Sequence, residues 1–381
     1  MVTLKNLNYF DNINLRSLDT LRGLLATYVL LGHCRWLLWA GNSEWNKHSH
    51  SWLANILAST SASLRYGHEA VMVFFVLSGF FIHLRVSQQL AKNLHFEFNV
   101  TNFFQRRSYR LIPPYLFALA LTVFVDLLGR YLYPTLYNGL TGDSLLDYNF
   151  QRKQFSVASV LPALLMLPSS LGEDFGSNGP LWSLSFEVVY YLLYPIWLNL
   201  RKLGALPAYF IGIALTISAG SFINVGFASQ VLLHYPIWLC GAAIAELLLT
   251  KRLPKLNIVI NTLILLIAFL CIQFISTMPL LISFYALFGS IVVTMVLRLP
   301  LPITNNKVHK FFENIGIESY SIYICHFPIV TFISAWYIEI FNSRPMHGWL
   351  AVFGTLLTLL ITHICFKACE RHFLHSRLKV K

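Results

Sequence analysis

Residues 69–87 read EAVMVFFVLSGFFIHLRVS, and they indicate the class of protein more clearly than any other stretch of the chain. Glu69 stands at one end and His83 and Arg85 at the other, with only uncharged residues between Glu69 and His83. An α-helix of this length is about 28 Å long, close to the roughly 30 Å thickness of a bilayer's hydrocarbon core. The stretch therefore predicts a helix that crosses a membrane.

Similar apolar segments recur along the whole chain. The sequence predicts ten spans, at residues 21–40, 69–87, 111–133, 182–200, 206–226, 229–249, 257–276, 279–299, 317–338 and 347–368. Only 12% of the 381 residues are charged, against roughly 25% in ordinary soluble domains. So few charges exclude a soluble enzyme and a disordered chain. We expect an all-α polytopic membrane helix bundle that forms a single domain over residues 1–381.

The basic residues predict how the bundle is oriented. The net charge is +12, but Lys and Arg lie in short clusters between apolar runs, which is typical of cytoplasmic loops and not of a nucleic-acid-binding face. Segment 155–168 is apolar but too short to span and contains Pro162, so we expect a buried or re-entrant helix there. With that segment not crossing, most basic residues fall on one side. This arrangement predicts that both termini are cytoplasmic.

The inner loop 88–110 ends in a dense basic cluster. Arg106, Arg107 and Arg110 lie just before Pro113 and Pro114, which suit the first turn of the third span. We expect the loop to form a helix on the membrane surface. Arginine side chains bind phosphate through two parallel hydrogen bonds, so the cluster is either a phosphate site or an ordinary cytoplasmic anchor.

Ionisable residues inside a membrane are costly and are therefore candidates for function. Arg22 opens the first span, with Asp19 three residues before it on the same helix face. His33 follows eleven residues later, roughly 16 Å along the helix and so near the bilayer centre. His33 is either a catalytic group or a histidine that hydrogen-bonds a neighbouring helix.

Two later spans carry similar groups. Glu187 lies about one and a half turns inside the fourth span, and the sequence does not identify its partner. His326, in the ninth span, is predicted at a depth similar to that of His33. The six cysteines form no CxxC pair or Cys/His cluster, so we expect neither a metal site nor disulfides.

Six motifs in this order resemble those of the acyltransferase-3 family of integral-membrane acyltransferases. They are SLDTLRGLLATYVLLGH (17–33), VFFVLSGFFI (73–82), FFQRRSYRLIPPY (103–115), WSLSFEVVYYLLYP (182–195), SYSIYICHFP (319–328) and the terminal Glu370. The turn at 66–70 is less glycine-rich than is usual in the family. The resemblance implies about ten spans. Some members carry a soluble esterase-like domain, and we expect this chain to act without one or with a separate partner.

The resemblance also implies roles for individual residues. His33 matches the catalytic histidine of the family, and Arg22 the basic residue that precedes it. Arg107 and Arg110 match an Arg-x-x-Arg motif associated with the acyl-CoA donor. Glu187 and His326 match polar positions that we expect to take part in catalysis, and Asp19 would orient Arg22 or contact the donor.

The function implied is O-acyl transfer, most simply O-acetyl transfer, at the plasma membrane. The donor would be cytoplasmic acyl-CoA, used as a substrate and not as a permanently bound cofactor. The acceptor would be a sugar hydroxyl of a lipid-linked or surface glycan, and membrane lipids and envelope-biosynthesis proteins would be further partners. A proton-coupled transporter using the buried histidines is one alternative. A membrane acyltransferase that modifies a lipid or small molecule is another.

Overall fold

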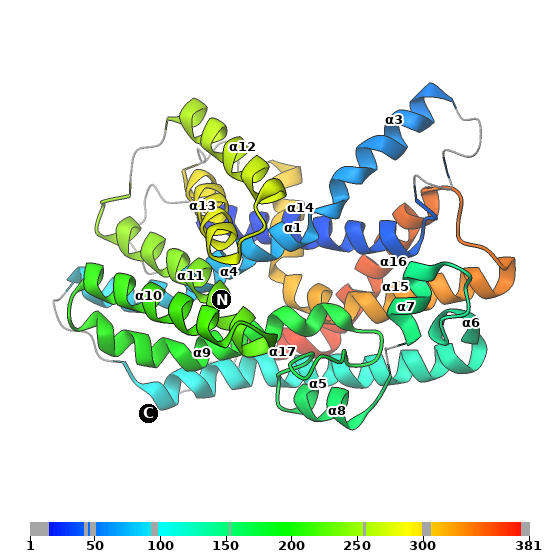
Figure 1. Cartoon of the computed structure of the whole chain (residues 1–381), viewed down its shortest axis with the longest axis horizontal. Coiled ribbons are helices and arrows are strands. Elements are labelled where there is room, and N and C mark those ends of the chain that lie inside the picture. Colours follow the sequence, from blue (N-terminus) through cyan, green and yellow to red (C-terminus); the bar gives the residue numbers. More distant parts are fainter. Residues whose placement is uncertain are drawn as a thin grey trace.

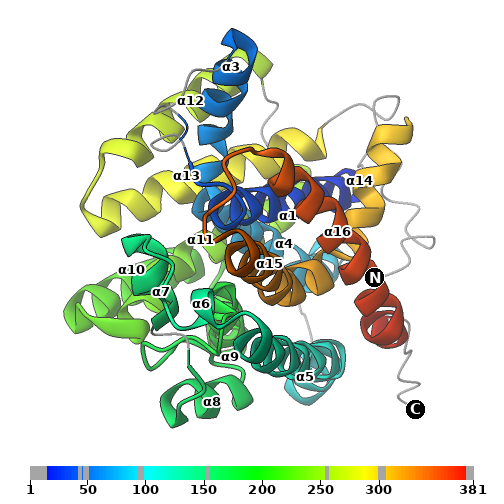
Figure 2. The same cartoon turned by 90° about the vertical axis from the view of Figure 1, so that its right-hand side faces the viewer.

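The computed structural model describes residues 15–41, 45, 51–92, 98–151, 154–253, 257–298 and 306–374. Every regular element in these ranges is a helix, and none is a strand. Most of the long helices run along the long axis of the molecule, which is horizontal in Figure 1, and are seen nearly end-on in Figure 2. The predicted all-α helix bundle is confirmed. The predicted cytoplasmic termini, at residues 1–14 and 375–381, lie outside the described ranges.

The helices follow one another with short connections. The first half comprises α1 (Leu15–Leu37), α3 (Trp52–Ser61), α4 (Gly67–Lys92), α5 (Val100–Leu132), α6 (Pro134–Tyr137), α7 (Ser144–Gln151), α8 (Val157–Leu164) and α9 (Trp182–Arg201). The second half comprises α10 (Ala205–Ile223), α11 (Gly226–Leu249), α12 (Ile258–Phe274), α13 (Met278–Leu297), α14 (Lys307–Ile317), α15 (Ser319–Phe341), α16 (Trp349–Cys365) and α17 (Arg371–Leu374). Short 3-10 helices cover Ala62–Arg65 and Gly179–Leu181, and a π-helical turn covers Phe366–Glu370.

Eight helical segments in the described part of the chain are long and apolar enough to cross a membrane. They contain α4, α5, α9, α10, α11, α13, α15 and α16. The other two predicted spans are also helices. α1 is less apolar because it carries Asp19, Arg22 and Arg35, and α12 has 17 residues. The chain is a membrane protein, and α8, with 8 residues, is too short to cross.

The third predicted span differs from expectation. α5 begins at Val100 and continues without a break through Pro113 and Pro114, so residues 98–110 form no separate surface helix. The two prolines lie inside the helix and not in its first turn. At 33 residues α5 is about 50 Å long, well beyond the roughly 30 Å hydrocarbon core. Its first third therefore carries the arginines as an extension of the span.

Glycine lets α4 and α11 approach backbone to backbone. A Cβ atom at Gly79 would lie 1.9 Å from the carbonyl oxygen of Trp238, and one at Gly241 would lie 1.9 Å from that of Val76. Small residues at a helix crossing permit such contact inside a membrane. The crossing fixes the register of α4, and with it the position of Ser78.

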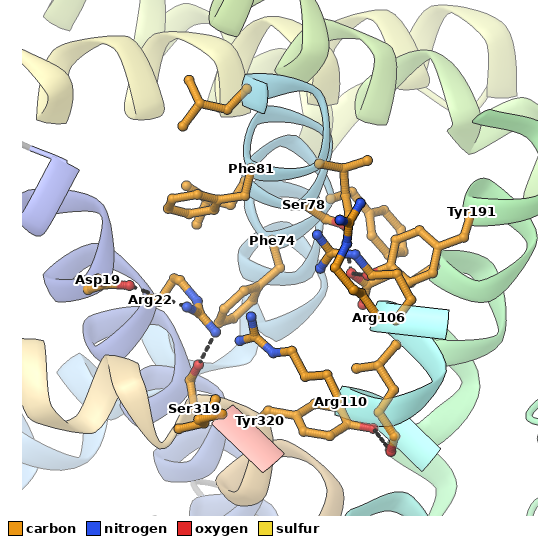
Figure 3. A pocket seen from close by; sticks show the side chains of 18 of the residues that line it. Asp19, Arg22, Phe74, Ser78, Phe81, Arg106, Arg110, Tyr191, Ser319 and Tyr320 are labelled. Atoms are coloured by element: carbon orange, nitrogen blue, oxygen red, sulfur yellow. Dashed lines mark hydrogen bonds and ion pairs between the residues drawn. The ribbon is translucent and has the colours of Figure 1, made fainter. Parts of the chain in front are cut away.

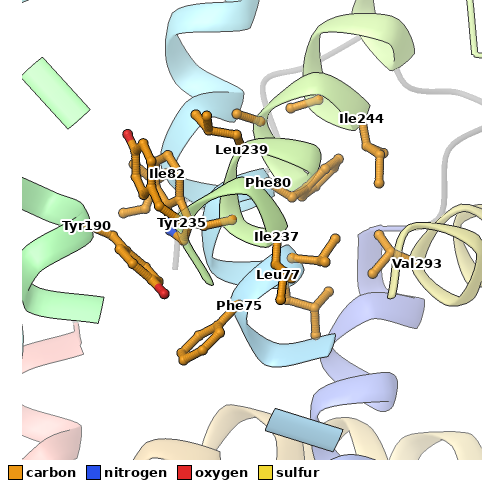
Figure 4. Close-up of a cluster of buried hydrophobic side chains, with 14 of the residues drawn as sticks. Phe75, Leu77, Phe80, Ile82, Tyr190, Tyr235, Ile237, Leu239, Ile244 and Val293 are labelled. Carbon is orange, nitrogen blue, oxygen red and sulfur yellow. The ribbon is translucent and has the colours of Figure 1, made fainter. Parts of the chain in front are cut away.

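Buried apolar and aromatic side chains fill the space around this crossing. Phe75 of α4 packs against Tyr190 of α9, and Tyr190 packs against Tyr235 of α11, while Phe80 of α4 lies in the same cluster (Figure 4). A second buried cluster joins α1, α5 and α15 through residues such as Leu30, Tyr115 and Val330. The cavity described next is lined by helices from both clusters.

Candidate active site

A cavity of about 1060 Å³ lies among α1, α4, α5, α9 and α15. Its wall is apolar on the α4 side, where Phe74 and Phe81 face it, and strongly basic on the α1 and α5 sides (Figure 3). Pockets of roughly 300–1000 Å³ hold small molecules and cofactors in most proteins. The volume is therefore sufficient for a ligand of nucleotide-cofactor size.

Six arginines line this cavity. They are Arg16 and Arg22 from α1, Arg85 from α4, and Arg106, Arg107 and Arg110 from α5. Because Arg107 and Arg110 are three residues apart, they share a face of α5. The guanidinium carbon of Arg107 lies 5.9 Å from the ring centroids of both Phe103 and Tyr191. In the described ranges, no carboxylate forms an ion pair with Arg106, Arg107 or Arg110, so their positive charges remain available to an anionic ligand.

Arg22 is held more firmly than the arginines of α5. Its Nη1 atom lies 3.3 Å from Asp19 Oδ1, and Nη2 donates to Ser319 Oγ at 2.9 Å. Asp19, Arg22 and Ser319 all line the cavity. Two of the three predicted site residues of α1, Asp19 and Arg22, therefore line the cavity, and Ser319 at the start of α15 fixes the guanidinium orientation.

Glu187 faces the cavity from α9. Its Oε1 atom accepts a hydrogen bond from Ser78 Oγ at 2.6 Å and another from the hydroxyl of Tyr191. Ser78 in turn accepts from the indole nitrogen of Trp238 at 3.2 Å. The partners that the sequence could not identify are therefore two hydroxyl groups, and these hydrogen bonds leave Oε2 without a partner within the described ranges.

The two mid-membrane histidines lie side by side. His33 Nδ1 is 2.8 Å from His326 Nε2, and the rings stack with centroids 5.0 Å apart. His326 also contacts the carbonyl oxygens of Ile322 and Tyr323, each 2.9 Å from Nδ1. His326 lines the cavity and is buried, whereas His33 is half-buried and reaches the cavity wall through its contact with His326. The predicted match in depth is confirmed, and the pair sits at the cavity wall.

Comparison with known families identifies the chain. The model of the acyltransferase-3 family, described as an acyltransferase domain, matches residues 15–366. The chain belongs to the acyltransferase-3 family. This match includes α1, α4, α5, α9 and α15, which surround the cavity with the six arginines (the arginine cavity), and it favours an acyltransferase over the proton-coupled transporter.

Individual relatives have low sequence identity to this acyltransferase-3 chain. Peptidoglycan O-acetyltransferase OatA of Listeria monocytogenes is 25% identical over 80% of this chain and 51% of its own length. Acyltransferase MdmB of Streptomyces mycarofaciens is 33% identical over 36% of this chain and 30% of its own. An uncharacterised Haemophilus influenzae protein is 26% identical over 51% of this chain and 83% of its own. The chain thus spans about half of OatA and less of MdmB. No solved structure gives a significant match.

Several residues that line the arginine cavity were not among the predicted site residues. The sequence predicted Arg85 only as a cytoplasmic residue and Ser78 as a packing residue, while Arg106 belonged to the cluster that was either a phosphate site or an anchor. Tyr191 follows Glu187 by four residues, a helical spacing that could have indicated their contact. Ser319 offered no such signal, because its role depends on how α15 meets α1.

Proposed function

We propose that the protein transfers an acyl group, most simply acetyl, from acyl-CoA to a hydroxyl group of an envelope glycan. The observation that carries this proposal is a cavity lined on one side by arginines without a carboxylate partner and on the other by His326, which contacts His33. The family assignment and the similarity to OatA, a peptidoglycan O-acetyltransferase, support the same chemistry.

The α5 arginines would hold the phosphates of CoA. Guanidinium groups bind phosphate through paired hydrogen bonds, and such a contact is strong where the arginine has no competing carboxylate. Arg106, Arg107 and Arg110 meet that condition among the described residues. Arg22, oriented by Asp19 and Ser319, would contact the donor deeper in the cavity. The extended pantetheine arm would then carry the thioester toward His326.

Histidine would supply the proton transfer. Attack of a sugar hydroxyl on the thioester forms a C–O ester bond and breaks the C–S bond. The hydroxyl proton passes to a histidine and from it to the departing CoA thiolate. Histidine suits this task because its pKa lies close to the working pH. Glu187 would assist by accepting a hydrogen bond from a substrate through its second carboxylate oxygen.

The proposed localisation is the plasma membrane, with the arginine side of the cavity facing the cytoplasm, where acyl-CoA is found. Reporter fusions after Lys202, Lys255 and Lys381 should then report the cytoplasm, and a fusion near Asn149 the outside. If the Asn149 and Lys202 fusions report the same side, this orientation is wrong.

The test of function is acyl transfer by the purified protein in lipid nanodiscs. The protein is incubated with radiolabelled acetyl-CoA and envelope glycan prepared from a strain that lacks its gene. We expect label in the glycan that mild alkali releases, as an ester requires, and none with a His33→Ala variant. Label in the lipid fraction instead would identify a lipid acceptor, and release of CoA without a labelled product would contradict transfer to the glycan.

A further inference from the structure

The hydrogen bonds of the histidine pair distinguish its two members. We propose that His326 is not a proton-transferring group but a neutral positioning residue that fixes the tautomer of His33. This inference rests on the proposed acyl transfer and assigns each ring a separate part in it.

The protonation of His326 follows from its acceptors. A carbonyl oxygen can only accept, so Nδ1 of His326 must carry the proton that is shared by the carbonyl groups of Ile322 and Tyr323. A neutral imidazole has a single N–H, so Nε2 of His326 holds the lone pair. The charged form is disfavoured because the ring is 2% exposed and no carboxylate of the described chain contacts it.

The tautomer of His33 follows in turn. Because His326 Nε2 can only accept, the 2.8 Å contact requires that His33 Nδ1 donates its proton. The lone pair of neutral His33 therefore resides on Nε2. When His33 takes a substrate proton at Nε2, its Nδ1–H still donates to His326, so the contact persists through the reaction.

The same bonds exclude His326 as the base. Both of its nitrogens are engaged, Nδ1 with the backbone of its own helix and Nε2 with His33. A substrate hydroxyl could reach a lone pair of His326 only by breaking the hydrogen bond between His326 and His33. Of the two rings, only His33 can accept a proton while every hydrogen bond of the pair is kept. His326 thus acts on the reaction only through His33.

Three substitutions at position 326 separate this role from others. A glutamine amide reaches about as far as Nε2 of histidine, so His326→Gln can place an oxygen to accept from His33. An asparagine amide reaches only the Nδ1 position, so His326→Asn is a matched amide that loses the acceptor. His326→Ala removes both contacts.

The measurements are kcat and the KM for acetyl-CoA, per mole of protein that elutes as a folded monodisperse species. We expect kcat of His326→Gln to fall by no more than about tenfold. The kcat values of His326→Asn and His326→Ala should fall by roughly 10²-fold or more, because His33 can then adopt the tautomer that carries its proton on Nε2 and cannot act as a base. KM should stay unchanged in all three, because the arginines that hold the donor are untouched.

Two results would overturn the proposal. Equal and large losses in Gln, Asn and Ala would make His326 itself a proton carrier. Activity near wild type in all three would show that His33 needs no partner. A fully active His33→Ala protein in the same assay would instead reject His33 as the base, and no transfer by the wild-type protein would reject the proposed function.

Discussion

Among the polar regions in the described part of this bundle, two differ in whether their hydrogen bonds are complete. In the first, which we call the closed network, Glu246 of α11 accepts from His83 Nε2 at 2.8 Å and from both Nε and Nη2 of Arg201. Tyr209 donates to the same carboxylate, and Tyr194 contacts the other nitrogen of His83. In the second, the arginine cavity, Arg106, Arg107 and Arg110 have no carboxylate partner in the described chain.

The difference shows how the two regions use similar side chains. Charges taken out of water must be paired, so a complete set of partners holds helices together and leaves nothing for a ligand. Guanidinium groups that lack a counter-charge beside a cavity destabilise the folded protein unless a bound ligand supplies that charge. The closed network joins α4, α9, α10 and α11, and the contrast supports our proposal that the arginine cavity is the binding site. The predictions below test this division.

The largest expected effect is on catalysis at the cavity. His33→Ala should lose transfer activity by roughly 10²–10⁴-fold, as loss of a general base does. His33→Gln should be nearly as inactive, because an amide cannot accept a proton in this pH range. The measurement is acyl transfer per mole of correctly folded protein. A His33→Gln variant with near wild-type activity would remove His33 from the chemistry.

The second prediction compares Glu246, which is buried in the closed network, with Glu187, which is half-buried at the cavity. Glu246→Gln leaves Arg201 without a counter-charge, and breaking a buried ion pair costs about 3–5 kcal/mol. The thermal midpoint should fall sharply. Glu187→Gln is the matched control, since Glu187 accepts only hydroxyl hydrogen bonds and faces the cavity. Equal shifts of the midpoint in the two variants would erase the distinction between the regions.

The third prediction concerns donor binding. Hydrogen bonds to charged groups contribute about 1.5–3 kcal/mol, so Arg110→Ala should raise the KM for acetyl-CoA by roughly 10–100-fold. Arg110→Lys should also be impaired, because an ammonium does not reproduce a two-bond contact with phosphate. Arg371→Ala is the control, as it removes the same charge from an exposed residue of α17. If Arg110→Lys has the wild-type KM, Arg110 is only a topology anchor.

The smallest expected effect is at Asp19. Its ion pair with Arg22 spans 3.3 Å, and Arg22 keeps Ser319 as a second partner. Ion pairs of this kind contribute about 0.2–1 kcal/mol, so Asp19→Asn should change the KM for acetyl-CoA by roughly two- to fivefold at most. A loss as large as that of Arg110→Ala would show that Asp19 contacts the donor directly.

The sequence predicted much of the fold because helix length and hydrophobicity are local properties. It also placed His33 and His326 at one depth, since the rise per residue is fixed. It did not predict that α5 continues through Pro113 and Pro114, because neighbouring helices can compensate inside a membrane for the hydrogen bonds that proline removes. Nor could the sequence show that His83 and Glu246 belong to a complete hydrogen-bond network whereas Glu187 faces the cavity. That difference depends on contacts between helices that are distant in sequence.

The most direct test of the central claim is the thermal midpoint of the purified protein with and without acetyl-CoA, at fixed ionic strength. A ligand at a hundred times its Kd stabilises the folded state by about 2.7 kcal/mol. We predict a clear rise in the midpoint for the wild-type protein and for His33→Gln, and a much smaller rise for the double variant Arg107→Ala/Arg110→Ala. No rise in the wild-type protein, or an equal rise in the double variant, would contradict the assignment of the arginine cavity as the acyl-CoA site.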